Sequence, residues 1–337
     1  GPATGLNLLQ AYIAVRDAGA AQHVLDILFA LNRPALEDRL HGFSNAIAEL
    51  IHSAKVAGRA DAGTSGVPAE ETKVNLVTIS KPIWFYGLEP LAEQVLPPKA
   101  GRLRHVAFAQ LAIPGVPDVL ALSARPEDEL GRLSRALPLW LAETFYFSPH
   151  YSPVAAVGLL GQHYALFGGE WTIDNLRQLV DTSNGPLDYI FTGAIRQVEG
   201  DYELILRVWE VKKFRERKQF TARWTPATID AELAKLHEQI RLFMEWTPEK
   251  KGLPYTAPAS PRAWLDLLGV SLSLFLGEKN LLSKEQLVVP EEILTRAAVD
   301  AARSEAASLA FLTLRNRSER LGVAARLTKP VRVADLI

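Results

Sequence analysis

The sequence predicts an α/β (α+β) protein: a mixed sheet with a β-meander, covered by helices and flanked by N- and C-terminal helical segments. Three observations predict this class. Apolar and polar residues alternate over 189–210 on both sides of a glycine turn, which is the period of a β-hairpin. Apolar residues recur every three to four positions over 126–147 and 226–246, which is the period of a helix. Hydrophobic residues make up 48% of the 337 residues, enough for a buried core.

Two stretches without apolar periodicity divide the chain. Residues 56–72 are rich in small and polar residues, and residues 247–261 carry four prolines, which interrupt helices and strand ladders. We interpret both as linkers. We therefore expect a helical segment over 3–55, an α/β domain over 73–246 and a second helical segment over 262–337.

The segment 3–55 is expected to form three short helices. Leu6, Leu9 and Ile13 lie at helical spacing, and Gly19 separates them from a second apolar series. Pro34 suits the first turn of a third helix. Three helices of this length bury only a small core, so we expect them to pack on the central domain or on a partner.

The central domain should alternate strands and helices. Its expected elements are a strand at 103–114, a helix at 126–147 that Pro138 kinks or breaks, a strand within 155–167, a helix at 172–180 capped by Thr172, the hairpin at 189–210, a third strand at 218–224 and a helix at 226–246. The final segment adds an apolar helix at 264–276 and a long Ala-rich helix at 293–314.

Charge and hydropathy exclude several classes of protein. With 37 Lys and Arg against 38 Asp and Glu, a chain-wide attraction to nucleic acid or anionic membrane is not expected. The longest helix-like apolar run, 267–277, is interrupted by Ser271 and Ser273 and is shorter than the ~20 residues that span a membrane. We expect no transmembrane segment and a cytoplasmic rather than a periplasmic location. Met244 is the only methionine, so the native N-terminus is not visible in this sequence.

No catalytic, cofactor-binding or metal-binding residue is predicted. The chain has no cysteine, which excludes disulfides, thiolate metal sites and a cysteine nucleophile. It has no phosphate-binding loop of the G-x-x-x-x-G-K-[ST] type, and its seven histidines form no H-E-x-x-H pattern. We interpret His237 and Glu238 as part of the polar face of the 226–246 helix.

A basic segment is the first candidate site for a partner. It places five basic residues and one acid around a predicted strand turn, beside aromatic residues. An acidic protein or a phosphate backbone would suit it, but basic residues also keep a sheet edge from pairing with other sheets. The five candidate residues are Lys212, Lys213, Arg215, Arg217 and Lys218.

An aromatic triplet is the second candidate. Trp84, Phe85 and Tyr86 follow Pro82, and three successive rings cannot all be buried on one side of a single strand. We therefore expect the triplet to dock another domain or another chain.

The order of motifs in the central domain carries a resemblance to a known family. The motifs are the strand His105–Leu111 before the helix at 127–147, the short helix Asp174–Leu179, the strand Leu187–Arg196 with Gly193 in its middle, the Gly200 turn, the return strand that ends Leu206–Val211, and the amphipathic helix after Trp224. Over about 103–246, this layout resembles the TolB N-terminal-like domain, related to the lipoprotein domains of the CsgG and FlgO type. Residues 74–102 have no counterpart in it. The resemblance implies a binding module without catalytic residues, of a kind found in periplasmic assemblies and in cytoplasmic signalling or scaffolding chains.

We expect a bacterial, non-enzymatic interaction or scaffolding protein that acts through protein–protein contacts, self-association into a homo-oligomer among them. A small-molecule-sensing regulatory module and an enzyme with no recognisable motif are the alternatives. A cleft lined by converging charged side chains with shifted pKa values would favour the enzyme, whereas a flat apolar surface would favour assembly.

Overall fold

The computed structural model describes residues 2–14, 18–30, 36, 40, 43, 74–99, 101–116, 122–123, 125–183 and 185–323. The chain divides into two compact units, 1–68 and 69–337. The predicted linker at 56–72 lies outside the described residues, as does most of the third helix expected in the first segment.

The first unit contains two of the predicted helices, α1 (Pro2–Ala14) and α2 (Ala18–Ala30). Their apolar faces pack on each other, and the side chains that form the small core are Leu6, Leu9, Ala21, Leu25, Leu28 and Leu40. Gly5 lies so close to Leu28 that a Cβ at this position would come within 2.7 Å of a leucine methyl group. The close approach of the two helices therefore depends on this glycine.

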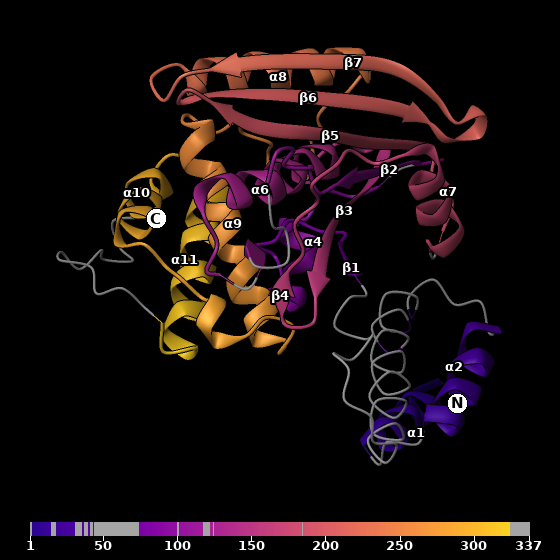
Figure 1. The fold of residues 1–337 in the computed structure, drawn as a ribbon. Helices are drawn as coiled ribbons and strands as arrows, with labels where there is room; N and C mark the ends of the chain where they lie inside the picture. The colour runs from indigo at the N-terminus through magenta and orange to yellow at the C-terminus, as the bar shows by residue number, and fades with distance from the viewer. Residues whose placement is uncertain are drawn as a thin grey trace, which may run out of the picture. The chain divides into compact units, whose positions relative to one another are not determined.

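The second unit is built on a mixed sheet, which confirms the predicted α/β class (Figure 1). Within the described residues the sheet has seven strands in the order β1-β3-β2-β5-β6-β7, with β4 paired to β3. Strands β2, β3 and β5 are parallel neighbours, and the other pairs are antiparallel. The strands are β1 (Val74–Ile79), β2 (Arg104–Ala109), β3 (Tyr151–Leu160), β4 (His163–Tyr164), β5 (Tyr189–Val198), β6 (Asp201–Glu210) and β7 (Arg215–Trp224).

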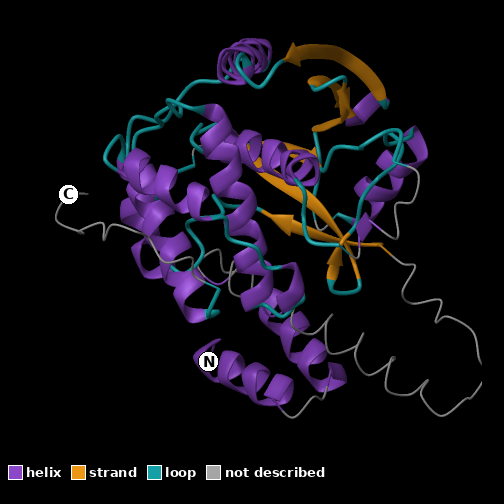
Figure 2. Ribbon diagram, turned by 60° about the vertical axis from the view of Figure 1, so that its left-hand side comes forward, coloured by secondary structure: helices purple, strands orange, loops and turns teal. Residues whose placement is uncertain are grey.

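Helices cover the sheet, and the C-terminal helices add a further layer (Figure 2). Helices α6 and α8 pack on strands, α9 packs on α6, and α10 and α11 pack on α9. No helix in the described ranges is long and apolar enough to cross a membrane. The helices are α4 (Ala92–Val95), α6 (Glu129–Tyr146), α7 (Ile173–Thr182), α8 (Ile229–Phe243), α9 (Pro261–Glu278), α10 (Glu291–Ala301) and α11 (Glu305–Arg320), with short 3-10 turns η1 (Glu89–Leu91), η2 (Val211–Lys213) and η3 (Lys284–Gln286).

The predicted hairpin forms as β5 and β6. Gly200 has a φ of +92°, the left-handed conformation that the turn between the two strands requires. Gly193 lies in the middle of β5, where a Cβ would come within 2.0 Å of the carbonyl oxygen of Ile205. The close contact between the two strands therefore excludes a side chain at this position.

Helix α6 continues through Pro138 without the break that its proline allows. Proline has no N–H, so the carbonyl of Ser134, four residues earlier, loses its helical partner. The main-chain N–H of Leu111 donates to this carbonyl instead, at 3.0 Å. The proline thereby frees an acceptor that joins α6 to the chain leaving β2.

The prediction of one long helix at 293–314 is wrong, because the chain forms two helices there. Helix α10 ends at Ala301, and α11 begins after Ser304, whose side chain accepts a hydrogen bond from the N–H of Ala307. The alanine-rich pattern is compatible with helix throughout, but the cap at Ser304 starts a new helix. The two helices then both reach α9.

Helix α9 is held against α6 by buried charges. Asp266 accepts from Arg132 of α6 at 2.9 Å and from Arg262 of its own helix at 3.0 Å. The Asp266 side chain is only 7% exposed, so these two partners compensate for its removal from water. This cluster fixes the position of α9, which carries Trp264 into the pocket described below.

Candidate functional site

Two of the three rings of the aromatic triplet are buried within their own unit. Trp84 and Phe85 are both 0% exposed, and Tyr86 is half-buried. The triplet lies in a turn after β1 and not in a strand, so the limit on burying three successive rings on one side of a strand does not apply to it. The Tyr86 ring packs on Phe275 of α9 with 4.7 Å between ring centroids. The triplet therefore docks on the C-terminal helices of the same unit.

The basic segment lies at the edge of the sheet. Strand β7 is the last in the strand order and begins at Arg215, earlier than predicted, so only two lysines belong to the turn. Arg215 and Arg217 both pair with Glu210, at 2.7 and 3.5 Å. All five predicted residues are exposed: Lys212, Lys213, Arg215, Arg217 and Lys218. The segment is accessible to a partner, although its arginines also have an acidic neighbour.

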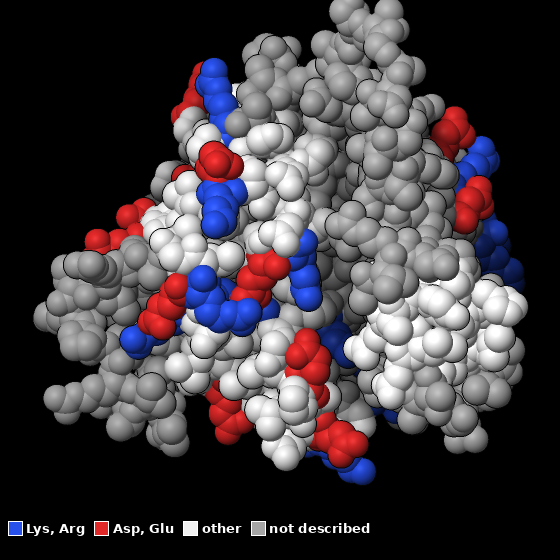
Figure 3. Space-filling view, turned by 90° about the horizontal axis from the view of Figure 1, so that it is seen from below, with Lys and Arg blue, Asp and Glu red and all other residues white. Residues whose placement is uncertain are grey.

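Charges elsewhere are mixed. On the face that Figure 3 shows, Lys and Arg side chains lie beside Asp and Glu side chains and do not form a field of one sign. This distribution agrees with the net charge of −1. A partner of uniform charge would therefore find no broad complementary surface on this face.

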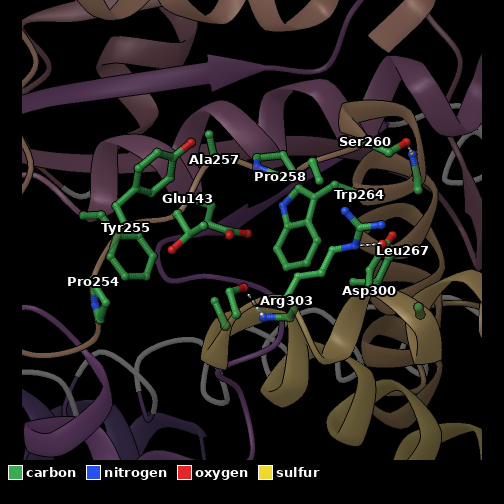
Figure 4. Close-up of a pocket in the computed structure, with 18 residues that line it drawn as sticks. Glu143, Pro254, Tyr255, Ala257, Pro258, Ser260, Trp264, Leu267, Asp300 and Arg303 are labelled. Carbon is green, nitrogen blue, oxygen red and sulfur yellow. Dashed lines mark hydrogen bonds and ion pairs between the residues drawn. The ribbon is translucent and has the colours of Figure 1, made fainter. Parts of the chain in front are cut away.

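A cavity of about 200 Å³ lies among the helices of the second unit (Figure 4). Its walls come from the end of α6, from the chain between α8 and α9, and from α9, α10 and α11. The proline-containing segment interpreted as a linker forms one of these walls through residues 254–260. The lining includes three aromatic side chains, Phe147, Tyr255 and Trp264, and several alanines and prolines.

Glu143 of α6 is the acid inside this cavity. The residue is 5% exposed, and its Oε2 atom has no hydrogen-bond partner in the described part of the chain. Burial raises the pKa of Glu143 to about 8, an effect that a hydrogen-bonding interaction with the Trp84 side chain partly opposes. Figure 4 shows its side chain between Tyr255 and Trp264. The carboxyl group is therefore largely protonated at neutral pH.

A buried hydrogen-bonded cluster fixes the Tyr255 wall. The Tyr255 hydroxyl lies 3.1 Å from His237 Nε2 and 3.2 Å from the Thr144 hydroxyl, and Thr144 lies 2.9 Å from the same imidazole nitrogen. Burial, together with the charge of Arg241, lowers the pKa of His237 to about 3, so the imidazole is neutral. The same burial raises the pKa of Tyr255. Neither group titrates near neutral pH.

The sequence pattern predicts His237 on the polar face of its helix, but the structure places it on the buried face. It is 3% exposed, and its ring stacks on Trp140 with 4.4 Å between centroids. The interpretation is wrong because residue 237 is four positions after Leu233 and three before Ile240, both buried, and so belongs to the apolar stripe.

An ion pair lies at the rim. Arg303 Nε is 2.9 Å from Asp300 Oδ1, and the two side chains are 59% and 27% exposed. Because these charges neutralise each other, the unpaired ionisable group among the described lining residues is Glu143. Acid–base catalysis usually needs a second group within hydrogen-bond reach of the first.

The sequence contains a signal for Glu143 that the analysis above does not use. Glu143 lies three residues after Trp140 and four before Phe147, both buried, so it belongs to the apolar stripe of α6. A carboxylate at such a position is a candidate for a shifted pKa. No sequence pattern marks Tyr255 and Trp264 as neighbours of Glu143, because they belong to segments that come together only when the chain folds.

No protein-family model and no curated protein sequence matches this chain. Among solved structures, the crystal structure of TolB from Acinetobacter baumannii is weakly similar, with a TM-score of 0.25 and 9% sequence identity. The match covers 54% of this chain and 32% of that chain, so this chain spans about a third of the length of its structural neighbour. At this level the likeness is only a loose hint of a TolB-like fold and says nothing of function.

Proposed function

We propose that this chain is a small-molecule-binding module whose ligand enters the cavity between α6, α9, α10 and α11. The observation that carries the proposal is Glu143, a buried carboxyl group among the residues that line the cavity, whose Oε2 atom has no hydrogen-bond partner in the described part of the chain. Buried polar atoms are nearly always hydrogen-bonded in folded proteins. A ligand that supplies the missing partner and fills the aromatic cavity would satisfy both the polar atom and the empty volume.

The proposal is tested with three probes that share one phenyl-ethyl skeleton: 2-phenylethylamine, 2-phenylethanol and phenylacetate. Binding of each to the full chain is measured by titration calorimetry. The Ala263→Leu substitution adds a larger side chain at a lining position of α9 and should abolish binding. Its matched control is Ala234→Leu, on the exposed face of α8.

Binding of at least one probe that Ala263→Leu removes and Ala234→Leu leaves unchanged would support a ligand site in the cavity. Absence of binding by all three probes would contradict the proposal. Binding that survives in the Ala263→Leu protein would contradict it as well, because the probe would then occupy another place.

A second candidate function is docking of an acidic protein segment at the basic edge of the sheet. It is favoured by the exposure of all five basic residues of the segment on and beside the edge strand β7. Binding of a labelled oligo-glutamate peptide, followed by anisotropy, should be lost in a Lys212→Glu, Lys213→Glu, Lys218→Glu variant. A Lys235→Glu, Lys251→Glu variant is the charge-matched control on exposed positions elsewhere. Tighter binding of a single-stranded oligonucleotide would favour a nucleic-acid partner instead.

Self-association remains a prediction as well. Trp84 and Phe85 are buried in their own unit, and Tyr86 is the half-exposed member of the triplet. Light scattering over a dilution series would measure whether the chain associates through another surface. A monomer at all concentrations would contradict the homo-oligomer.

A further inference from the structure

Resting on the proposed function, we propose that the ligand of the cavity is a small hydrophobic amine, whose ammonium group pairs with Glu143 while its apolar body lies against the aromatic walls. This assigns a charge and a size to the ligand.

The charges around the cavity favour a cation. Apart from the Tyr255 hydroxyl, which stays neutral, the ionisable side chains among the described lining residues are Glu143, Asp300 and Arg303, and the last two are 2.9 Å apart and cancel each other. Within the described part of the chain, no basic side chain contributes to the electrostatic surroundings that shift the pKa of Glu143. A cationic ligand is therefore the complement of the site, because it supplies a hydrogen-bond donor to Oε2 and a counter-charge to the carboxylate once that group ionises.

The aromatic side chains of the walls also favour a cation. Phe147 and Tyr255 lie with their ring centroids 5.7 Å apart, and Trp264 lines the same cavity. The faces of aromatic rings attract organic cations, and tryptophan does so most strongly. An anionic ligand would meet the same rings and the Glu143 carboxyl, and among the described lining residues the one cation, Arg303, is already paired with Asp300.

The volume of the cavity limits the size of the ligand. A cavity of ~150 Å³ in another protein accommodates benzene, so the present cavity of about 200 Å³ accommodates an aromatic ring with a short side arm. A primary amine on a two-carbon arm has these dimensions. Phenylethylamine is thus a probe of the site, and phenylethanol is its neutral counterpart with nearly the same shape.

Binding of an ammonium ion displaces the proton of the Glu143 carboxyl. Burial raises the pKa of Glu143 to about 8, so an ammonium ion that pairs with the carboxylate displaces a proton at neutral pH. The other groups near Glu143 do not change charge between pH 6 and 8: the His237 imidazole is neutral because its pKa is lowered to about 3, and the pKa of Tyr255 is raised. Arg241 of α8 and the Asp300–Arg303 pair complete the charged surroundings. The amine itself stays protonated over this range.

The test is the pH dependence of affinity for the intact chain. Phenylethylamine should bind about tenfold more tightly at pH 7 than at pH 6, with a smaller further gain up to pH 8.5, because the proton on Glu143 must leave. Phenylethanol should not gain affinity as the pH rises. Phenylacetate should bind more weakly than both. These measurements need only the wild-type protein.

The Glu143→Gln variant separates charge from shape. Glutamine fills the same volume without ionising, so it should remove the pH dependence of phenylethylamine binding and weaken that binding at least tenfold at pH 8. Phenylethanol should bind the variant within about threefold of wild type, which shows that the cavity is intact. Glu238→Gln, an exposed position on α8, is the matched control.

The outcomes distinguish this inference from the proposed function. If phenylethanol binds as tightly as phenylethylamine at pH 8, or if amine affinity is flat between pH 6 and 8, the amine assignment is overturned while the ligand site stands. If no probe binds at all, both are overturned.

Discussion

The guanidinium group of Arg317 is buried and donates a hydrogen bond to the main-chain carbonyl of Ile83, at 3.2 Å and 234 positions earlier in the chain. The same group donates to the carbonyl of Tyr86 and pairs with Glu278 at 3.2 Å. One side chain of α11 thus supplies hydrogen-bond donors to two carbonyl groups of the turn that holds the aromatic triplet. The same side chain joins this turn to Glu278 of α9. The C-terminal helices that form the cavity are anchored to the rest of their unit at this point.

Replacing Arg317 with Met should destabilise this unit strongly. The substitution leaves Glu278 and two carbonyls without their buried donor, which typically costs about 3–5 kcal/mol. Arg320 also pairs with Glu278 at 3.2 Å, but its side chain is 68% exposed, so Arg320→Met should cost less than about 1 kcal/mol. Urea unfolding followed by tryptophan fluorescence measures both, because all seven tryptophans belong to the second unit. Equal losses in the two variants would contradict the anchoring role.

Glu143→Gln should stabilise the protein at alkaline pH. Between pH 4.5 and about 8 the carboxyl is protonated in the folded state and ionised in the unfolded state, so unfolding releases a proton. The wild-type free energy of unfolding therefore falls as the pH rises through this window, by at most ~1.4 kcal/mol per pH unit. The glutamine variant lacks this loss.

We expect Glu143→Gln and wild type to be similarly stable at pH 5, and the variant to be the more stable by about 2–5 kcal/mol at pH 8.5. Urea unfolding at the two pH values measures the difference. Glu238→Gln, at an exposed position, should show no such trend. A stability difference independent of pH would show that the carboxyl is not protonated in the folded protein.

His237 should produce the opposite dependence at acidic pH. Its pKa is lowered to about 3 in the folded state, so between pH 6.5 and about 3 the unfolded chain binds a proton that the folded chain does not. This contribution to stability is complete above pH 6.5 and is lost as the pH falls. His237→Gln removes it, together with the stacking on Trp140.

His237→Gln should therefore be less stable than wild type at pH 7, by about 1–3 kcal/mol from lost packing, and the gap should narrow as the pH falls to 4.5. Unfolding free energies at pH 7, 5.5 and 4.5 measure it. His150→Gln, on an exposed residue, is the control. A gap that widens with acid would contradict a neutral imidazole.

Local patterns predicted much of this fold. The hairpin β5–β6 and helix α6 each follow from the period of their own residues, which needs no knowledge of distant segments. Strand β1 was not predicted, since its residues Val74–Ile79 form a strand by pairing with β3, about 80 positions later. The end of α10 was missed for a related reason: alanine-rich sequence is helical on both sides of Ser304, and only the cap and the packing on α9 separate the two helices.

The cavity was harder to predict than the fold. Glu143 has a sequence signal in the apolar stripe of its helix, but the residues that surround it come from four segments between positions 143 and 307. The sequence of the proline-containing segment that forms one wall is typical of a linker. Only the packing of α9 on α6 makes these segments one site, and that packing depends on pairs such as Arg132 with Asp266.

Gly193→Ala should destabilise the hairpin strongly. The added Cβ would come within 2.0 Å of the Ile205 carbonyl oxygen, and main chain cannot move aside as a flexible side chain can. We expect a loss of about 2–4 kcal/mol in the free energy of unfolding. Gly169→Ala is the matched control, because nothing lies within 4 Å of a Cβ there, and it should change stability by less than about 0.5 kcal/mol. If both variants unfold at the wild-type urea concentration, the strands β5 and β6 are not as close at this point as the structure places them.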